Sequence, residues 1–236
     1  MCSESNDKPA AGVLAMGCVT TQKPSRNHSE ETKRRGWHYR EVMETAGLRY
    51  HGCTLRNFVA SNESQHRVKT EMTEFCRNIQ ANVAGGRNLI LFGPTGTGKD
   101  HLMAAGIRAA IRDVGASVKW ANGVELFARV RDNMKNGGSE KAVANEFTEP
   151  DVLAISDPVP PMGGLTNFQM AFLQRIIDAR YRRFLATWIT INVANGREAE
   201  ERIGTPAVDR LRHGCLQLFC NWGSYRKGIQ AAAAED

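Results

Sequence analysis

No stretch of about 18 consecutive apolar residues occurs in the 236 positions of this sequence, so none of its segments has the pattern of a membrane-spanning helix. The first ten residues, MCSESNDKPA, also lack the basic start and the apolar stretch of a secretion signal. We therefore expect a cytoplasmic protein with no membrane partner.

Metal-binding patterns of cysteine and histidine are missing as well. The six cysteines, at positions 2, 18, 53, 76, 215 and 220, include no pair at CxxC spacing. No histidine pair flanks them at the spacing of a zinc site. We expect free thiols, as in a reducing compartment, and neither a zinc module nor a disulfide framework.

The composition is that of a folded domain with a basic surface. Hydrophobic residues make up 42% and charged residues 24%, which is enough apolar material for a core. The length allows one sizeable α/β domain with an appendage rather than two full domains. The formal net charge of +6 suits an anionic partner such as nucleic acid, although many basic proteins bind none.

The first 45 residues differ from the rest. Residues 1–28 are rich in Ser, Asn, Lys and Pro and show no sustained period, which predicts a flexible tail. Residues 29–45 predict a helix with Ser29 as its N-cap, ended by Gly47. We take residues 1–45 as a flexible tail with a partner-binding helix, and residues 46–236 as the main domain.

Strand and helix patterns alternate along the main domain. A helix is expected from about Asn62 to Val83, and Asn122 is expected to cap another. A long helix is predicted over residues 166–184. Short apolar strands are predicted at residues 88–92, 117–121, 151–155, 187–193 and 215–219. This alternation of continuous apolar strands with helices predicts a parallel sheet covered by helices on both faces.

The run 93-GPTGTGKDHL-102 follows the first of these strands and precedes a helix. Its glycines and lysine satisfy G-x-x-x-x-G-K, in which backbone N–H groups, a helix N-terminus and an ammonium group hold phosphates. We therefore predict that residues 46–236 bind ATP. The predicted contacts are Gly93, Pro94, Thr95, Gly96, Thr97, Gly98, Lys99, Asp100 and His101.

Asp100 departs from the usual pattern of such a loop. At this position a Ser or Thr hydroxyl normally binds Mg²⁺. A carboxylate can bind magnesium too, but it brings a negative charge towards the phosphate oxygens. The first turn of a helix also favours a carboxylate, so a simple capping role is the alternative.

A second departure follows the strand at residues 151–155. A hydrolytic site of this kind needs two acidic residues there, one to steady magnesium and one to polarise the attacking water. Ser156 occupies the first position and Asp157 the second. We predict a Mg²⁺ site formed by Asp100, Ser156 and Asp157, with Asp157 as the catalytic residue. A turn cap beside Pro158 is the alternative for Asp157.

Taken together and in this order, several segments resemble the DnaC-type AAA+ helicase loaders and the related IstB-type transposition ATPases. The resemblance covers roughly residues 40–226. It is carried by AGLRYHGCTLRNFVASNESQ (46–65), the glycine loop, DVLAISD (151–157), TINVAN (190–195), ERIG and VDRLR (201–212) and NWGSYR (221–226). It implies an AAA+ P-loop NTPase core with a parallel five-stranded sheet, helices on both faces and a reduced or absent C-terminal lid.

The resemblance also implies roles for individual residues. Asn192 matches the residue that senses the γ-phosphate, and Arg210 matches the arginine finger that reaches the ATP of a neighbouring subunit. Arg226 matches a late arginine that contacts the nucleotide of its own subunit. Arg212 is the alternative finger, a helix cap is the alternative for Asn192, and a surface arginine is the alternative for Arg226. The implied catalytic set is Lys99, Asp157, Asn192 and Arg210.

The function implied is that of an ATP-binding DNA replication protein, a helicase loader with weak ATPase activity that uses ATP and Mg²⁺. Its implied partners are a hexameric replicative helicase, single-stranded DNA and further copies of itself. Two alternatives remain: an IstB-type transposition helper, and a nucleotide-sensing adaptor with little hydrolysis. The basic and aromatic run 33-KRRGWHYR-40 is a candidate for DNA contact through Trp37 and Tyr39, or for a protein partner.

The two departures suggest a testable exchange, in which Asp100 supplies the charge near the metal and Ser156 the hydroxyl. If so, Asp100→Thr combined with Ser156→Asp should keep ATPase activity, while each single change should lower it. Steady-state ATP hydrolysis by the three variants checks this. A double variant no better than the worse single variant would contradict the exchange and favour decayed catalysis.

Overall fold

The computed structural model describes residues 26–160 and 163–226. The flexible tail predicted for residues 1–28 therefore lies, up to residue 25, outside the described residues. Helix α1 (Arg26–Ala46) begins before Ser29, so the prediction of Ser29 as its N-cap is wrong. In the described part of the chain, no helix is both long and apolar enough to cross a bilayer.

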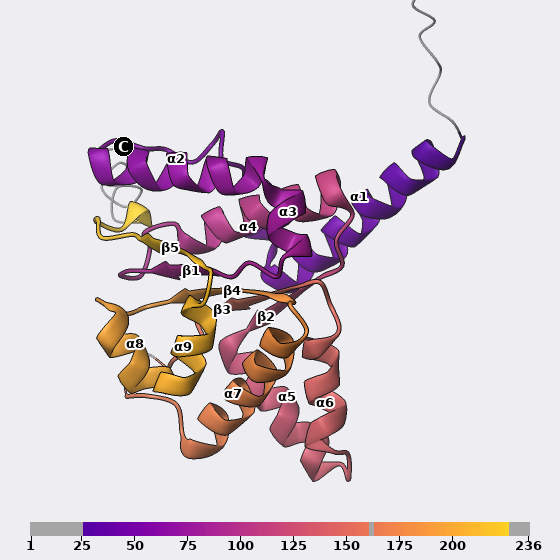
Figure 1. Cartoon of the computed structure of the whole chain (residues 1–236), viewed down its shortest axis with the longest axis vertical. Helices are drawn as coiled ribbons and strands as arrows, with labels where there is room; N and C mark the ends of the chain where they lie inside the picture. Colours follow the sequence, from indigo (N-terminus) through magenta and orange to yellow (C-terminus); the bar gives the residue numbers. More distant parts are fainter. Residues whose placement is uncertain (1–25, 161–162, 227–236) are drawn as a thin grey trace, which may run out of the picture.

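A five-stranded parallel sheet forms the centre of the molecule (Figure 1), as predicted. The strand order is β2-β3-β4-β1-β5, and every neighbouring pair is parallel. The strands are β1 (Leu89–Phe92), β2 (Val118–Asn122), β3 (Val152–Ser156), β4 (Ala186–Ile191) and β5 (Leu216–Phe219). Because all strands run the same way, the carboxyl ends of β3, β4 and β1 meet side by side at one edge.

Helices cover both faces of the sheet (Figure 1). Alternate residues of β1 divide between two cores: Leu89 and Leu91 pack with α1–α4, and Ile90 and Phe92 pack with α5–α9. The remaining helices are α2 (Glu63–Arg77), α3 (Ile79–Ala84), α4 (Lys99–Ala109), α5 (Gly123–Lys135), α6 (Glu140–Thr148), α7 (Asn167–Arg182), α8 (Gly196–Ile203) and α9 (Thr205–Arg212). A 3-10 turn, η1 (Leu48–Tyr50), follows α1, and a π-helical turn, η2 (Ala110–Val114), extends α4.

Several local predictions need correction. The helix expected over residues 62–83 is broken at Asn78, whose side chain donates to the carbonyl oxygen of Glu74. Asn122 precedes α5 but makes no capping bond, because its side chain binds Trp120 and Glu125 instead. Helix α6 is absent from the predicted elements. The side-chain oxygen of Ser139 caps this helix by accepting a hydrogen bond from the N–H of Ala142.

Helix α1 packs directly on the main domain. Tyr39, Val42, Met43 and Ala46 are buried in the same core as one face of the sheet. Tyr39 is only 1% exposed and its hydroxyl donates to the carbonyl oxygen of His51, so the expectation that Tyr39 stacks on bases is wrong. The helix therefore shares a core with the residues beyond the expected boundary at 45/46. The division into domains and partner binding by α1 stay predictions.

One buried arginine fixes the amino ends of β3 and β4. Arg180 of α7 is fully buried, and burial lowers the pKa of its guanidinium to about 9. Its nitrogens donate to five oxygens within 3.2 Å, those of Thr187 Oγ1 and of the carbonyls of Phe147, Pro150, Asp151 and Ala186. These bonds hold together the chain segments that lead into β3 and β4. They support the register that places Ser156 beside Thr190 at the opposite ends of the strands.

Candidate nucleotide-binding site

The glycine loop joins β1 to α4 and depends on conformations that only glycine adopts readily. Gly93, Gly96 and Gly98 have φ values of 142°, 85° and 85°. A Cβ on Gly93 would lie 2.2 Å from the carbonyl oxygen of Cys220. A Cβ on Gly96 would lie 2.0 Å from the hydroxyl oxygen of Ser224. The glycines therefore allow the C-terminal segment to lie close against the loop.

That segment, residues 220–226, fixes the loop by donating hydrogen bonds to the carbonyl groups of the loop. Trp222 Nε1 donates to the carbonyl oxygen of Thr97 at 3.0 Å, and the N–H of Tyr225 donates to that of Gly96 at 3.0 Å. Among the described residues, the backbone N–H groups of residues 95–98 make no hydrogen bond. A run of free N–H groups before a helix N-terminus is the donor set that phosphate groups prefer. The loop therefore fits a nucleotide's phosphates.

Lys99 lies folded over the loop. Its ammonium group donates to the carbonyl oxygens of Gly93 at 2.8 Å and Pro94 at 2.7 Å, and the residue is only 6% exposed. Burial lowers the pKa of Lys99, while the neighbouring Cys220, Asp100 and Asp157 oppose that shift. To bind a phosphate, the ammonium group has to exchange these carbonyls for phosphate oxygens. The role of Lys99 in nucleotide binding stays a prediction.

The carboxylate of Asp100 accepts hydrogen bonds from three hydroxyl groups. Oδ1 lies 3.0 Å from Ser156 Oγ and 2.8 Å from Thr190 Oγ1, and Oδ2 lies 3.3 Å from the hydroxyl of Tyr50. Burial and the charge of Asp100 raise the pKa of Tyr50 to about 12, so Tyr50 remains a donor at neutral pH. Asp100 and Ser156, which the sequence predicted to act together, do lie in contact.

No role was predicted for Thr190 or Tyr50, although both lie in segments that carry the resemblance. Thr190 could have been found from the strand register, because it lies opposite Ser156 in the β3–β4 pair. Tyr50 has no local signal, since it lies 50 residues before Asp100 and reaches it only through the packing of η1.

Asp157 and Asn192, which were predicted separately as site residues, lie in contact. Asn192 Nδ2 donates to Asp157 Oδ2. Asp157 has a φ of 43°, an uncommon conformation for a residue other than glycine, and its Oδ1 is buried without a partner among the described residues. Burial raises the pKa of Asp157, and the hydrogen bonds from Asn192 and the charge of Lys99 oppose that rise. A strained backbone and an unpaired buried oxygen are features that functional sites often carry.

The oxygen atoms at these strand ends suit Mg²⁺, which prefers hard oxygen ligands and keeps several waters. Asp100 and Asp157 supply carboxylates, and Ser156 supplies a hydroxyl group. Within the described residues, no group of three or more His, Cys, Asp or Glu side chains could hold a metal on its own. Magnesium bound here would therefore depend on nucleotide phosphates and water as well.

His101, predicted to contact the nucleotide, faces the segment that follows η1. Its Nε2 lies 2.9 Å from the carbonyl oxygen of Thr54, and burial lowers the pKa of its imidazole. The ring of Phe58 meets the rings of His101, Trp222 and Tyr225 edge to face, with centroids 5.5 to 6.4 Å apart. This aromatic cluster joins the segment after η1 to the C-terminal segment beside the loop. Contact between His101 and a nucleotide stays a prediction.

The arginines differ in their distance from the loop. Arg210 on α9 donates to Asp178 Oδ1 at 2.7 Å, and Arg212 is paired with Glu200. The carbonyl group of Arg210 accepts from Asn88, just before β1, so Arg210 lies at the end of the sheet opposite the loop of its own chain. Arg226 is exposed and close enough to the loop for its charge to add to the lowering of the Lys99 pKa that burial causes.

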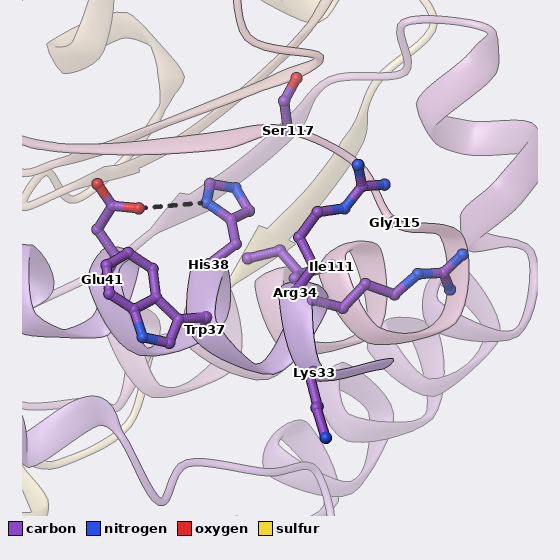
Figure 2. A pocket seen from close by; sticks show the side chains of 10 residues that line it. Lys33, Arg34, Trp37, His38, Glu41, Ile111, Gly115 and Ser117 are labelled. Atoms are coloured by element: carbon purple, nitrogen blue, oxygen red, sulfur yellow. Dashed lines mark ion pairs between the residues drawn. The ribbon is translucent and has the colours of Figure 1, made fainter. Parts of the chain in front are cut away.

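The basic and aromatic run on α1 borders a cavity of about 580 Å³ (Figure 2). Two side chains that line this cavity make hydrogen bonds within the protein. Arg35 donates to the carbonyl oxygens of Arg112 and Asp113, and His38 accepts from the N–H of Val118. Trp37 is 68% exposed, and Lys33 and Arg34 are exposed beside it. These three form the outer basic–aromatic cluster of α1.

The strand order, the glycine loop after β1 and the polar ends of β3 and β4 define an AAA+ P-loop ATP-binding protein. The family model for IstB-like ATP-binding proteins matches residues 27–233, which is most of the chain. The chain therefore belongs to the IstB-like ATP-binding protein family. The resemblance stated from its motifs is confirmed.

One curated relative is named as an insertion sequence ATP-binding protein of Sinorhizobium fredii, and is 31% identical over 151 residues. The match covers 61% of this chain and 48% of the relative, so the chain spans about half the length of that relative. The DnaC helicase loader structure has a TM-score of 0.65 at 24% identity, over 73% of this chain and 99% of that one. AMPPCP-bound DnaA from Aquifex aeolicus has a TM-score of 0.59 at 17% identity, over 78% and 55%. At these identities the two structures establish a shared fold.

The environment of Asp157 predicts a stability gain on substitution. Because burial raises its pKa, ionised Asp157 destabilises the folded state above the ordinary carboxyl pKa of about 4. Asp157→Asn should therefore raise the free energy of unfolding at pH 7 by about 0.5–2 kcal/mol. The gain should shrink as the pH falls towards 4 and below, where Asp157 is protonated in both states. Urea unfolding at the two pH values measures this.

Asp151→Asn is the matched control at the other end of β3. The carboxylate of Asp151 accepts from the N–H and the hydroxyl of Ser117 at 2.8 and 2.7 Å, so its substitution should give no gain. A loss of stability at pH 7 in Asp157→Asn, as large as that in Asp151→Asn, would contradict the expectation.

Proposed function

We propose that the chain is an ATP-dependent DNA-associated protein that assembles with a second protein on DNA. The observation that carries this proposal is the meeting of the glycine loop with Asp100, Ser156, Asp157 and Asn192 at one edge of the sheet. Two partners are candidates. The IstB-like family and the insertion-sequence relative favour a transposase, and the fold shared with the DnaC helicase loader favours a hexameric replicative helicase.

The nucleotide part of the function rests on the geometry of the loop. Free N–H groups of residues 95–98 and the Lys99 ammonium would hold the phosphates of ATP, with Mg²⁺ neutralising part of their charge. Asn192 would orient Asp157 towards the attacking water. Because Asp157 has a short side chain with one oxygen already bonded to Asn192, we propose a weak ATPase. A nucleotide sensor with no turnover is the limiting case.

Self-association is proposed through α9. Arg210 lies at the far end of the sheet from the loop of its own chain, so a nucleotide that it contacts has to belong to a neighbouring subunit. In the isolated chain Asp178 neutralises this arginine at 2.7 Å. An arginine finger at Arg210 would therefore have to leave Asp178 as subunits assemble. If Arg212 is the finger instead, it would have to leave Glu200.

The first test is nucleotide binding. Lys99→Met should weaken binding of a fluorescent ATP analogue by about ten-fold or more, because charge-assisted contacts to phosphate are lost. Lys119→Met is the matched control, since Lys119 lies on β2 and pairs with Glu146 of α6. Absence of binding by the wild-type chain would contradict the proposed function. Tight binding without hydrolysis, with or without DNA, would favour the sensor.

The second test distinguishes the partners. The purified chain loaded with ATP is mixed with either a replicative helicase or a transposase, and complexes are measured by size-exclusion chromatography. A complex with the transposase alone supports the transposition helper, and a complex with the helicase alone supports the loader. Formation of either complex only when ATP is present would link partner binding to the nucleotide site.

DNA contact is proposed for the outer basic–aromatic cluster of α1, Lys33, Arg34 and Trp37 (Figure 2). Trp37→Ala should weaken binding of single-stranded DNA about ten-fold, because stacking on a base contributes about 1–3 kcal/mol. Phe168→Ala, a partly exposed aromatic on α7, should change nothing. Fluorescence anisotropy with an oligothymidine checks both. Equal affinities for both variants and the wild type would move DNA contact away from α1.

A further inference from the structure

Two of the three hydroxyl groups that hold Asp100 belong to residues for which the sequence predicted no role in the site. Tyr50 lies in η1, directly after α1, and Thr190 lies within β4. Both donate to the carboxylate next to the loop lysine. These hydrogen bonds act on a negative charge that lies where phosphates are expected.

The direction of the Tyr50 hydroxyl is set by packing. The Tyr50 ring stacks on Trp120 of β2, with centroids 5.7 Å apart and an angle of 27° between the planes. Its backbone is fixed too, since the N–H of Tyr50 donates to the carbonyl oxygen of Gly47 at 3.0 Å, at the end of α1. The hydroxyl therefore meets Asp100 from a position that the core determines.

Thr190 connects the two acidic residues of the site. The N–H of Asp157 donates to Thr190 Oγ1 at 3.3 Å, and that hydroxyl in turn donates to Asp100 Oδ1 at 2.8 Å. Thr190 is 1% exposed and paired with Ser156 in the sheet, so the hydroxyl has little freedom to turn elsewhere. This chain of bonds fixes the position of Asp100 relative to Asp157.

The electrostatic consequence concerns the carboxylate and the nucleotide. A carboxylate in the first turn of α4 repels phosphate oxygens, and a cation placed between them reverses that interaction. The three hydroxyl groups hold the carboxylate towards the ends of β3 and β4. Each hydroxyl removed leaves the negative charge of Asp100 less compensated, so its repulsion of the phosphates is stronger when no cation is present.

We propose that Tyr50, together with Thr190, is a positioning residue that holds Asp100 and thereby sets how strongly nucleotide binding depends on Mg²⁺. This inference rests on the proposed nucleotide-binding function. In the proposed arrangement Tyr50 touches neither nucleotide nor metal and acts only through Asp100. It also connects the end of α1 to the nucleotide site.

The test compares the dissociation constant of a fluorescent ATP analogue in EDTA with that in Mg²⁺. In Tyr50→Phe the ratio of the two constants should rise by about three- to ten-fold over the wild type, because affinity falls mainly in EDTA. Asp100→Asn should lower the ratio, since it removes the charge. Tyr39→Phe is the matched control: it loses a tyrosine hydroxyl that binds His51 in the same core, and should leave the ratio unchanged.

Thr190 gives an independent pair of variants. Thr190→Val keeps the shape but loses the hydroxyl and should raise the ratio, whereas Thr190→Ser keeps the hydroxyl and should retain the wild-type ratio. A ratio in Tyr50→Phe and Thr190→Val equal to that of Tyr39→Phe would overturn the inference while leaving the proposed function intact. Absence of nucleotide binding by the wild type in both buffers would overturn both.

A nucleotide-free measurement checks the contact itself. Urea unfolding of Tyr50→Phe, Asp100→Asn and the double variant, in EDTA without nucleotide, forms a double-mutant cycle. The two changes should couple by about three- to ten-fold in the unfolding equilibrium constant. Additive effects would show that the hydroxyl does not hold Asp100 and would overturn the inference, whatever the nucleotide data show.

Discussion

The parallel alignment of β3, β4 and β1 is the constraint on which the site depends. The interiors of these strands are almost wholly buried, so polar side chains are concentrated where each strand ends. Pairing of Ser156 with Thr190 and of Phe92 with Ile191 brings three of these ends together. Arg180 holds the opposite ends of β3 and β4. A shift of one residue in either pair would turn the polar side chains to the other face.

The site concentrates unfavourable features that a bound nucleotide and cation would relieve. Asp157 carries a positive φ, an unpaired buried oxygen and a raised pKa, and Lys99 has a pKa lowered by burial. Two carboxylates lie near the place where phosphates are expected. Each feature destabilises the free protein modestly, and each is neutralised by an opposite charge or a hydrogen bond. This is the pattern expected of a site that is complete only with its ligand.

Segments distant in sequence complete the site from both sides. Tyr50 reaches Asp100 from the end of α1, and Trp222 and Tyr225 hold the glycine loop from the last described residues of the chain. Phe58 lies in the segment that follows Tyr50 and contacts both Trp222 and Tyr225, so it joins that segment to the C-terminal one. The end of the N-terminal helix is therefore connected to the nucleotide loop through packed side chains.

The sequence by itself determined the five strands, the position of the glycine loop and the candidates Asp100, Ser156 and Asp157, because local apolar runs and short motifs encode them. Asn192 came from the resemblance to a known family. The sequence did not predict α6, the break at Asn78 or the burial of Tyr39, although the bonds at these places join residues only 3 to 12 positions apart, Ser139 with Ala142, Asn78 with Glu74 and Tyr39 with His51. Only the tertiary structure decided that Tyr50 and Thr190 hold Asp100 and that Asp178 pairs with Arg210. Such contacts join residues 32 to 90 positions apart, and no local pattern records which of the many possible partners the folded core brings within reach.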